Sequence, residues 1–197
     1  MYRNTLTTIT AVFALTINLV FSQVVINEIM YNPPGYQGSD YDYEFMELHN
    51  PGATAVDMSG YSYTQGVNHV FADGTTLAAG GYMIVCVPTL TSAGNVNGDV
   101  ANNVFDPDGD GVHTNGAVVV EWTSGGLSNG GEDIEIIDSN GDVVDFVDYE
   151  DGTNGYGNWG NAHDGGGGSL ELVDATAPND SASAWQTSWI PSGTPGV

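Results

Sequence analysis

The stretch EDIEIIDSNGDVVDFVDY, residues 132–149, consists of two strand-like runs joined by turn residues. The first run is EDIEIID (132–138) and the second is VVDFVDY (143–149). Asn140 and Gly141 lie between them, and both residue types tolerate the positive φ that a two-residue hairpin turn requires. The stretch therefore predicts a β-hairpin.

The rest of the chain shows the same succession of short strand-like runs and turn residues. Glycine, at 28 of 197 residues, is abundant enough for many tight turns, and no window shows sustained helical periodicity. Strands at this spacing predict an all-β fold, a sandwich of short, mostly antiparallel strands. The remaining strand-like runs are residues 24–31, 44–50, 56–63, 70–71, 81–87, 117–122 and 169–174.

Two regions interrupt this pattern and are expected to form long loops rich in Gly and Asp. Residues 88–116 read as an insertion that contains the motif DPDGDG, and residues 150–168 are rich in Gly and Asn. Loops of this length within a domain are usually functional or mobile.

The first residues read as an export signal. A short positive start ends at Arg3, and an apolar run follows from Leu6 to Phe21. This pattern predicts a secretory signal peptide over residues 1–22, the alternative being an uncleaved membrane anchor. The sandwich domain is then expected over residues 23–190, with a linker or tail at 191–197.

No second apolar run of that kind follows, so we expect no membrane insertion after cleavage of the signal. The expected location is secreted or at the cell surface. Cys86 is the single cysteine, which excludes an intramolecular disulfide. It lies in an apolar run and is expected to be buried.

The charge is extreme, with 25 Asp and Glu against one Lys or Arg. Arg3 is that one cation, and it lies in the predicted signal. A chain of this kind repels itself unless salt screens the charges, over a Debye length of about 8 Å at physiological ionic strength. We expect an extracellular medium that is salty or contains calcium. We expect no nucleic-acid partner, because phosphate binding depends on Lys and Arg.

In their order and spacing, several motifs resemble the lamin tail domain family in its bacterial, secreted form. The resemblance covers about residues 24–196 and is interrupted by the insertion. Met58 and Tyr61 depart from the family pattern, in which Leu and Trp are common at these places. The motifs are VVINEIMYNP (24–33), EFMELHNPG (44–52), VDMSGYSY (56–63), FADGTTLAAGGYMIV (71–85), the hairpin stretch from Leu127 to Tyr149, SLELVD (169–174), Ala184-Trp185 and GTPG (193–196).

The resemblance implies an immunoglobulin-like β-sandwich without catalytic residues. It implies a non-enzymatic, exported interaction or scaffolding module of adhesion type, whose partner is an extracellular protein or polymer. The alternative is a carbohydrate-binding accessory module of an extracellular hydrolase system. Tyr31, Tyr36, Tyr41 and Tyr43 could form a sugar-binding surface, although we favour a role in covering one end of the sandwich.

The residues give little support to catalysis. There is no Gly-x-Ser-x-Gly elbow, and the four histidines do not form a His-Glu-x-x-His zinc pattern. His49 is expected to be structural and His163 to be exposed, the alternative for His163 being a metal ligand. Glu44 and Glu47 are expected on opposite faces of a strand, and a buried Glu47 would accept hydrogen bonds. A metal-dependent hydrolase is the least favoured interpretation. The four tryptophans, Trp122, Trp159, Trp185 and Trp189, are expected in the core or capping its ends.

The motif DPDGDG suggests a calcium loop. Asp106, Asp108 and Asp110 occupy the first, third and fifth places of such a loop, and alternate carboxylates on a tight turn can direct oxygens at one cation. The twelfth place is Ala117 rather than a bidentate Glu, which excludes an EF-hand. The sequence thus proposes calcium as a cofactor at these three aspartates, the alternative being a solvated acidic turn.

Overall fold

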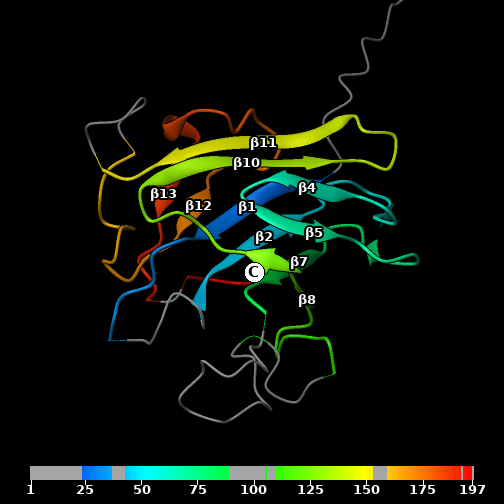
Figure 1. Cartoon of the computed structure of the whole chain (residues 1–197), viewed down its shortest axis with the longest axis horizontal. Helices are drawn as coiled ribbons and strands as arrows, with labels where there is room; N and C mark the ends of the chain where they lie inside the picture. Colours follow the sequence, from blue (N-terminus) through cyan, green and yellow to red (C-terminus); the bar gives the residue numbers. More distant parts are fainter. Residues whose placement is uncertain are drawn as a thin grey trace, which may run out of the picture.

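The computed structural model describes residues 24–36, 43–88, 105, 110–152, 159–191 and 193–196. Two β-sheets form the two layers of a sandwich (Figure 1). This architecture confirms the predicted immunoglobulin-like β-sandwich of mostly antiparallel strands. The predicted signal peptide, residues 1–22, lies outside the described residues. Within the described part of the chain, no helix is long and apolar enough to span a membrane.

The larger sheet has six strands and contains the first and the last strand of the described chain. Its pairs are antiparallel except for the last pair, β7 and β8, which is parallel and is joined across the long insertion. In spatial order its strands are β13 (Trp185–Thr187), β12 (Leu170–Leu172), β1 (Val25–Met30), β2 (Phe45–His49), β7 (Tyr82–Cys86) and β8 (Val118–Glu121).

The second sheet has five strands. A separate two-stranded ribbon is formed by segments that precede and follow two of these strands in the sequence. A single turn of 3-10 helix, η1 (Ala182–Ala184), precedes β13. The five strands are β11 (Val143–Glu150), β10 (Gly131–Ile137), β4 (Ser62–Gln65), β5 (Val67–Val70) and β9 (Ser124–Gly125), and the ribbon is β3 (Val56–Asp57) with β6 (Thr76–Leu77).

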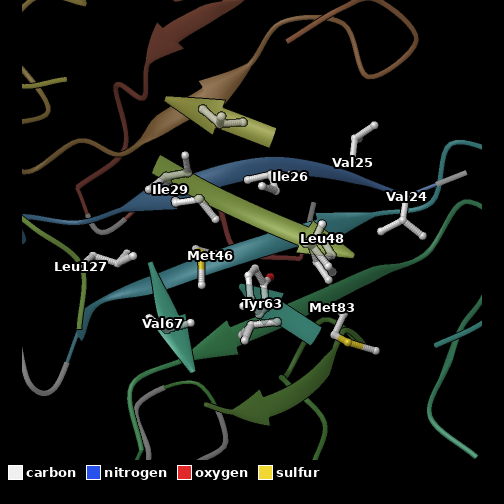
Figure 2. Packing of buried hydrophobic residues seen from close by; sticks show 14 of the residues in the cluster. Val24, Val25, Ile26, Ile29, Met46, Leu48, Tyr63, Val67, Met83 and Leu127 are labelled. Carbon is white, nitrogen blue, oxygen red and sulfur yellow. The ribbon is translucent and has the colours of Figure 1, made fainter. Parts of the chain in front are cut away.

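The main core lies between the two sheets. Figure 2 shows Ile26 and Ile29 of β1 with Met46 and Leu48 of β2 packed towards Tyr63 of β4. Ile26, Ile29, Met46 and Leu48 are all 0% exposed. Burial of one such side chain contributes about 1.5–3 kcal/mol, so this layer supplies much of the stability of the fold.

A β-bulge at Asn27 decides which side chains of β1 enter this core. Ile26 faces Leu48 and Glu28 faces Glu47, so Asn27 is an extra residue with no partner of its own in this register. The bulge reverses the alternation of the strand. Ile26 and Ile29 therefore both face the core, and Glu28 faces away from it.

Asp145 of β11 joins the two sheets at this bulge. Its Oδ2 accepts hydrogen bonds from the Ile26 N–H at 2.7 Å and from Asn179 Nδ2 at 2.8 Å. Burial raises the pKa of the Asp145 carboxyl, although these donors work in the opposite direction. The Ile26 amide at the bulge is thus hydrogen-bonded to the opposite sheet, and this bond fixes the two layers relative to each other.

The predicted hairpin of residues 132–149 is confirmed, but its turn is longer than predicted. The Asp138 N–H donates to Asp142 O at 2.9 Å, and the Gly141 N–H donates to Asp138 O at 3.0 Å. Residues 139–141 therefore form a three-residue loop, with Gly141 at φ 90°. The Asp138 carboxylate accepts the N–H groups of Asn140 and Asp142, and this side-chain contact favours the longer loop.

Two further strand predictions need correction. The run 56–63 is broken at Met58–Tyr61, where the chain leaves β3 and enters β4. The strand predicted at 70–71 begins earlier, as β5, and the short strands β6 and β9 were not anticipated as separate elements. Short strands such as these carry too few residues for a pattern to identify them.

Candidate functional site

The calcium motif falls only partly within the described residues. Asp106 and Asp108 lie outside them, while Asp110 is exposed and its Oδ1 accepts the Val112 N–H at 2.9 Å. Across the described ranges, no group of three or more His, Cys, Asp or Glu is arranged to hold a metal ion. Calcium binding at DPDGDG therefore stays a prediction.

Residues on both sides of this motif are anchored to the outer face of the six-stranded sheet. The Phe105 ring lies 5.1 Å from the Phe45 ring in an edge-to-face contact and belongs to a second, smaller core with Met30 and Ile84. After the motif, Gly111 O accepts the Val119 N–H of β8 at 2.9 Å. Phe105 and Ala117 thus pack on an apolar half of this outer face. Cys86 belongs to the same small core and is buried, as predicted.

The other half of the outer face is acidic. Glu171 of β12, Glu28 of β1 and Glu47 of β2 lie directly opposite one another on three neighbouring strands. We call these three residues the covered acidic row. Like charges in this cross-strand relation repel one another, and the described chain contains no Lys or Arg to balance them. Glu28 is nevertheless only 1% exposed, and Glu47 is 0% exposed.

The C-terminal residues 193–196, here called the C-terminal strap, lie over this row. The Thr194 N–H donates to Glu28 Oε1 at 2.8 Å, and Thr194 Oγ1 donates to Glu171 Oε1 at 2.8 Å. The Gly196 N–H donates to Glu47 Oε2. The segment that the sequence predicted as a linker or tail thus contacts three strands of the sheet.

Polar groups of the sheet and the insertion complete these contacts. Asn27 Nδ2, from the bulge in β1, donates to Glu47 Oε1 at 2.8 Å, and Ser169 Oγ donates to Glu28 Oε1. Asn115 Nδ2 donates to Pro195 O at 2.6 Å and holds the strap from the side of the insertion. The expectation that a buried Glu47 accepts hydrogen bonds is confirmed.

Burial changes the protonation of the row. It raises the pKa of Glu28 to about 7 and that of Glu47 to about 8, and the neighbouring glutamates add to the rise while the hydrogen-bond donors reduce it. Both side chains therefore carry a proton for a large part of the time at neutral pH. Raised carboxyl pKa values also occur in hydrolase active sites. Here the strap covers both carboxyl groups, so the arrangement is better suited to holding the strap than to meeting a substrate.

An open groove of about 500 Å³ lies beside β13, next to the start of the strap. Trp189 stands at this groove and is 97% exposed, which corrects the prediction that it lies in the core or caps one of its ends. The other three tryptophans are buried, as predicted. The groove is lined by Ala162, Gly166, Gly167, Gly168, Gln186, Thr187, Ser188, Trp189 and Pro191.

Tyr36 stands beside the same groove. It is 75% exposed, and a Cβ added to Gly167 would lie 2.7 Å from its hydroxyl oxygen. The residues that follow β1 and residues 159–168, here called the Gly-rich loop, therefore meet at this glycine. Tyr31, by contrast, is buried, and Tyr41 lies outside the described residues. Tyr31 belongs to the main core, and the exposure of Tyr36 does not fit the expectation that the tyrosines cover one end of the sandwich.

His163 corrects a second prediction, since it is 1% exposed rather than solvated. Its Nε2 donates to Trp159 O at 2.9 Å, and its Nδ1 then accepts the Tyr31 hydroxyl at 2.8 Å. Burial lowers the pKa of His163, which favours the neutral ring. Asn32 Nδ2 also donates to Asp164 Oδ1 at 2.5 Å. These contacts attach the Gly-rich loop to the end of β1 and so shape one wall of the groove.

His49 has the structural role that the sequence indicated. Its ring stacks on Tyr82 with 4.2 Å between the centroids, and its Nδ1 donates to Gly81 O at 3.1 Å. Glu44 lies just before β2, and its carboxyl group does not share a partner with that of Glu47, which bonds to the strap. Glu44 Oε2 accepts the Leu127 N–H at 2.9 Å and so holds the segment that leads into β10.

The covered acidic row and the groove were not identified from the sequence. A single Glu in the middle of each of two apolar strands, at Glu28 and Glu47, was the available signal. The bulge that turns Glu28 outwards leaves no such signal, because Asn27 resembles any other strand residue.

The two facing sheets define an immunoglobulin-like domain, and comparison with known families identifies which one. The model of the Lamin Tail Domain family matches residues 20–151, which is more than half of the chain. The chain therefore belongs to the lamin tail domain family, an immunoglobulin-like family generally involved in protein interaction and not known for catalysis. No curated protein matches the chain. The matched residues end just after β11, so β12, β13, the groove and the strap lie beyond them.

Proposed function

We propose that this protein is a non-catalytic, exported interaction module of adhesion or scaffolding type that binds its partner at the groove beside Trp189. One observation carries the proposal: an indole ring that is 97% exposed at the mouth of a groove. Membership of a family generally involved in protein interaction supports it.

The exposed apolar surface here is larger than a lone side chain. Ile190 follows Trp189 and is 55% exposed, and Tyr36 stands at the Gly-rich loop. Trp and Tyr are enriched among the residues that contribute most of the binding energy at protein interfaces. An interaction surface therefore accounts for aromatic rings that the core does not use.

The charge of the chain restricts the partner. With 25 acidic residues and Arg3 as the one cation, the surface attracts an extracellular protein or polymer that carries positive charge or that binds through calcium. We propose Asp106, Asp108 and Asp110 as calcium ligands. The anchoring of Phe105 and Gly111 on the sheet supports this, because it holds both ends of the motif in place.

Site-specific photo-crosslinking tests the binding surface. A benzoylphenylalanine at position 189 is expected to capture a component of the cell's own surface, and the same group at Val70 is not. Val70 is 65% exposed on the five-stranded sheet and provides a matched position. Equal capture from both positions would reject the groove as the binding site. Recovery of a chain beginning at Gln23 from the medium tests export.

Thermal unfolding tests calcium binding. Extracellular modules bind calcium with dissociation constants of about 0.1–1 mM, so millimolar calcium is expected to stabilise the domain by about 0.4–1.4 kcal/mol. The Asp108→Ala, Asp110→Ala variant is expected to lose this increment. If both proteins gain equally, calcium acts only by screening charge.

Carbohydrate binding is the second candidate function. It is favoured by the exposed rings of Tyr36 and Trp189 at a groove whose lining includes the polar side chains of Gln186 and Ser188. Aromatic rings that flank polar groups can stack on sugars. Glycan-array binding that is lost in a Tyr36→Ala, Trp189→Ala variant would support this candidate, and a blank array for the native protein would reject it.

A further inference from the structure

The C-terminal strap is held on the sheet mainly by hydrogen bonds to carboxyl groups. Thr194 and Gly196 donate backbone N–H groups to Glu28 and Glu47, and the Thr194 hydroxyl donates to Glu171. A four-residue segment held in this way can dissociate without unfolding the sandwich, because the main core lies on the other face of the sheet.

The strap also keeps water away from the row. A Cβ added to Gly193 would overlap with Glu28 Oε1, so the backbone of this glycine lies directly on the carboxyl group. Gly193 has φ 74°, a conformation that glycine adopts without strain. When the strap is down, the charged forms of Glu28 and Glu47 are poorly hydrated and the protonated forms are favoured.

Hydrogen-bond donors around the row and in the strap offset this effect only in part, and no charged group of the surrounding elements adds to that offset. Glu171 of β12 adds negative charge, and Tyr82 of β7 lies near Glu47. The neutral ring of His49 stacks on Tyr82, and burial lowers its pKa. The described residues of the strap contain no ionisable side chain. Closing the strap is therefore coupled to proton uptake by the row, and raising the pH favours its opening.

The strap in turn holds the loop that presents Trp189. Residues 188–191, here called the Trp189 loop, connect β13 to the strap. The Gly193 N–H donates to Ile190 O at 3.0 Å, and the Ile190 N–H donates to Ser188 Oγ at 3.2 Å. On the other side, the Ser188 N–H donates to Ser169 O at 2.9 Å. Release of the strap would leave this loop attached at one end only.

We propose that the C-terminal strap is a pH-controlled clamp on the Trp189 loop: proton uptake by the covered acidic row holds the strap down, and proton loss releases it. This regulation rests on the proposed function of the groove. The position of the clamp makes binding at Trp189 strongest at acidic to neutral pH and weaker at alkaline pH. The pKa values of about 7 and 8 for Glu28 and Glu47 support a transition in that range.

Amide exchange measured by NMR on the full chain tests the clamp without any partner. The Thr194, Gly196 and Ile190 amides are expected to be protected at pH 6 and to exchange too fast for detection at pH 9, while the amides of β1 and β2 stay protected. The Glu28→Gln, Glu47→Gln variant cannot lose these protons and is expected to keep the strap amides protected at pH 9.

A pair of glycine variants provides the steric control. Gly193→Ala is expected to abolish protection of the strap at pH 6. Gly74→Ala is expected to leave it intact, since Gly74 has a similar φ of 86° and no atom lies within 4 Å of an added Cβ. Melting of β1 and β2 together with the strap would overturn the proposal, because the opening would then be global.

Two other results would also overturn the clamp: protection of the native strap that persists at pH 9, and loss of protection in the Gln variant at the same pH as in the native protein. The outcomes separate the two proposals. If crosslinking at position 189 captures nothing, the proposed function fails while the exchange results stand. If capture is equal at pH 6 and pH 9, the regulation fails and the binding site remains.

Discussion

Both outer faces of the sandwich place acidic side chains opposite one another, but these side chains are exposed on one face and covered on the other. On the five-stranded sheet, Asp133 of β10 faces Asp148 of β11, and Asp148 is exposed to solvent. On the six-stranded sheet, Glu28 faces both Glu47 and Glu171, and the strap covers the row. The chemistry is the same on both faces, so the difference lies in access to water.

The comparison shows how a chain nearly without cations can bury carboxyl groups. Water screens the exposed pair, and the pKa of Asp148 is raised, first by partial desolvation and then by the charge of Asp133. Water does not screen the covered row, and no Lys or Arg of the described chain neutralises it. The carboxyl groups of the row are therefore protonated more readily. Backbone N–H groups of the strap then supply the donors that basic side chains supply in other proteins.

The strongest test of this difference places a further carboxylate on each face. Ile84→Asp adds one next to Glu47, at a position that is 0% exposed and surrounded by the small core. The expected loss in the free energy of unfolding is about 4 kcal/mol, because the new group is desolvated and has no donor. Thr64→Asp, beside Glu135 on the exposed face, is expected to cost under about 1 kcal/mol. Similar losses in urea unfolding would contradict the role of burial.

Removing an aromatic ring from each face tests the apolar half of the covered face. Phe105→Ala is expected to destabilise the domain by about 3 kcal/mol, since Phe105 is 6% exposed and contacts Phe45. Phe146→Ala on β11, where the ring is half-buried opposite Glu135, is expected to cost about 1 kcal/mol. Chemical denaturation measures both. An equal loss at the two positions would mean that the small core around Phe105 contributes no more to stability than the exposed face does.

The two faces are expected to differ in how their contribution to stability depends on pH. Glu28 and Glu47 have folded pKa values above the ordinary value of 4.5, so the folded state binds more protons than the unfolded state between about pH 4.5 and pH 8. Their contribution to stability is therefore full below pH 4.5 and is lost as the pH rises through 8. We expect the free energy of unfolding to fall by about 2 kcal/mol over this pH range. The loss is limited because release of the strap rehydrates the carboxylates.

Matched neutral variants identify the source of that slope. Glu28→Gln, Glu47→Gln is expected to flatten it in unfolding experiments between pH 5 and pH 9, and Asp133→Asn, Asp148→Asn is expected to leave it as in the native protein. If the second variant flattens the slope and the first does not, the covered row is not its origin.

The smallest expected effect is on the exposed pair itself. Asp148→Asn removes a like-charge contact with Asp133 and is expected to stabilise the domain by about 0.5 kcal/mol at low salt. The gain should disappear at 1 M salt, where the Debye length is about 3 Å. Careful thermal unfolding at the two salt concentrations would detect it, and a gain independent of salt would point to a cause other than charge.

The parts of the fold that depend on local sequence could be predicted. The hairpin of 132–149 and the strands at Val25–Met30 and Tyr82–Cys86 have their apolar runs and turn residues close together in the chain. The length of the hairpin loop could not be predicted, because it depends on how the Asp138 side chain bonds to its neighbours.

The candidate sites depend on contacts between distant parts of the chain, which a single sequence does not reveal. Thr194 contacts Glu28, and His163 contacts Tyr31, across more than a hundred residues in both cases. Trp189 follows a strand and would be placed in the core by its type alone. It lies two residues beyond the end of β13 at Thr187, outside the sheet, and its exposure cannot be inferred from the local sequence.

The position of β12 has a consequence for anyone who prepares a shortened form of this protein. A recombinant fragment that stops where the family match stops, at residue 151, would lack the strand that pairs with Glu28 and Ile29. One side of β1 would then expose unpaired amides and carbonyls along an apolar strand, which is a template for intermolecular association. Such a fragment is expected to precipitate or form oligomers, whereas one extended past Thr187 keeps β1 in the interior of its sheet.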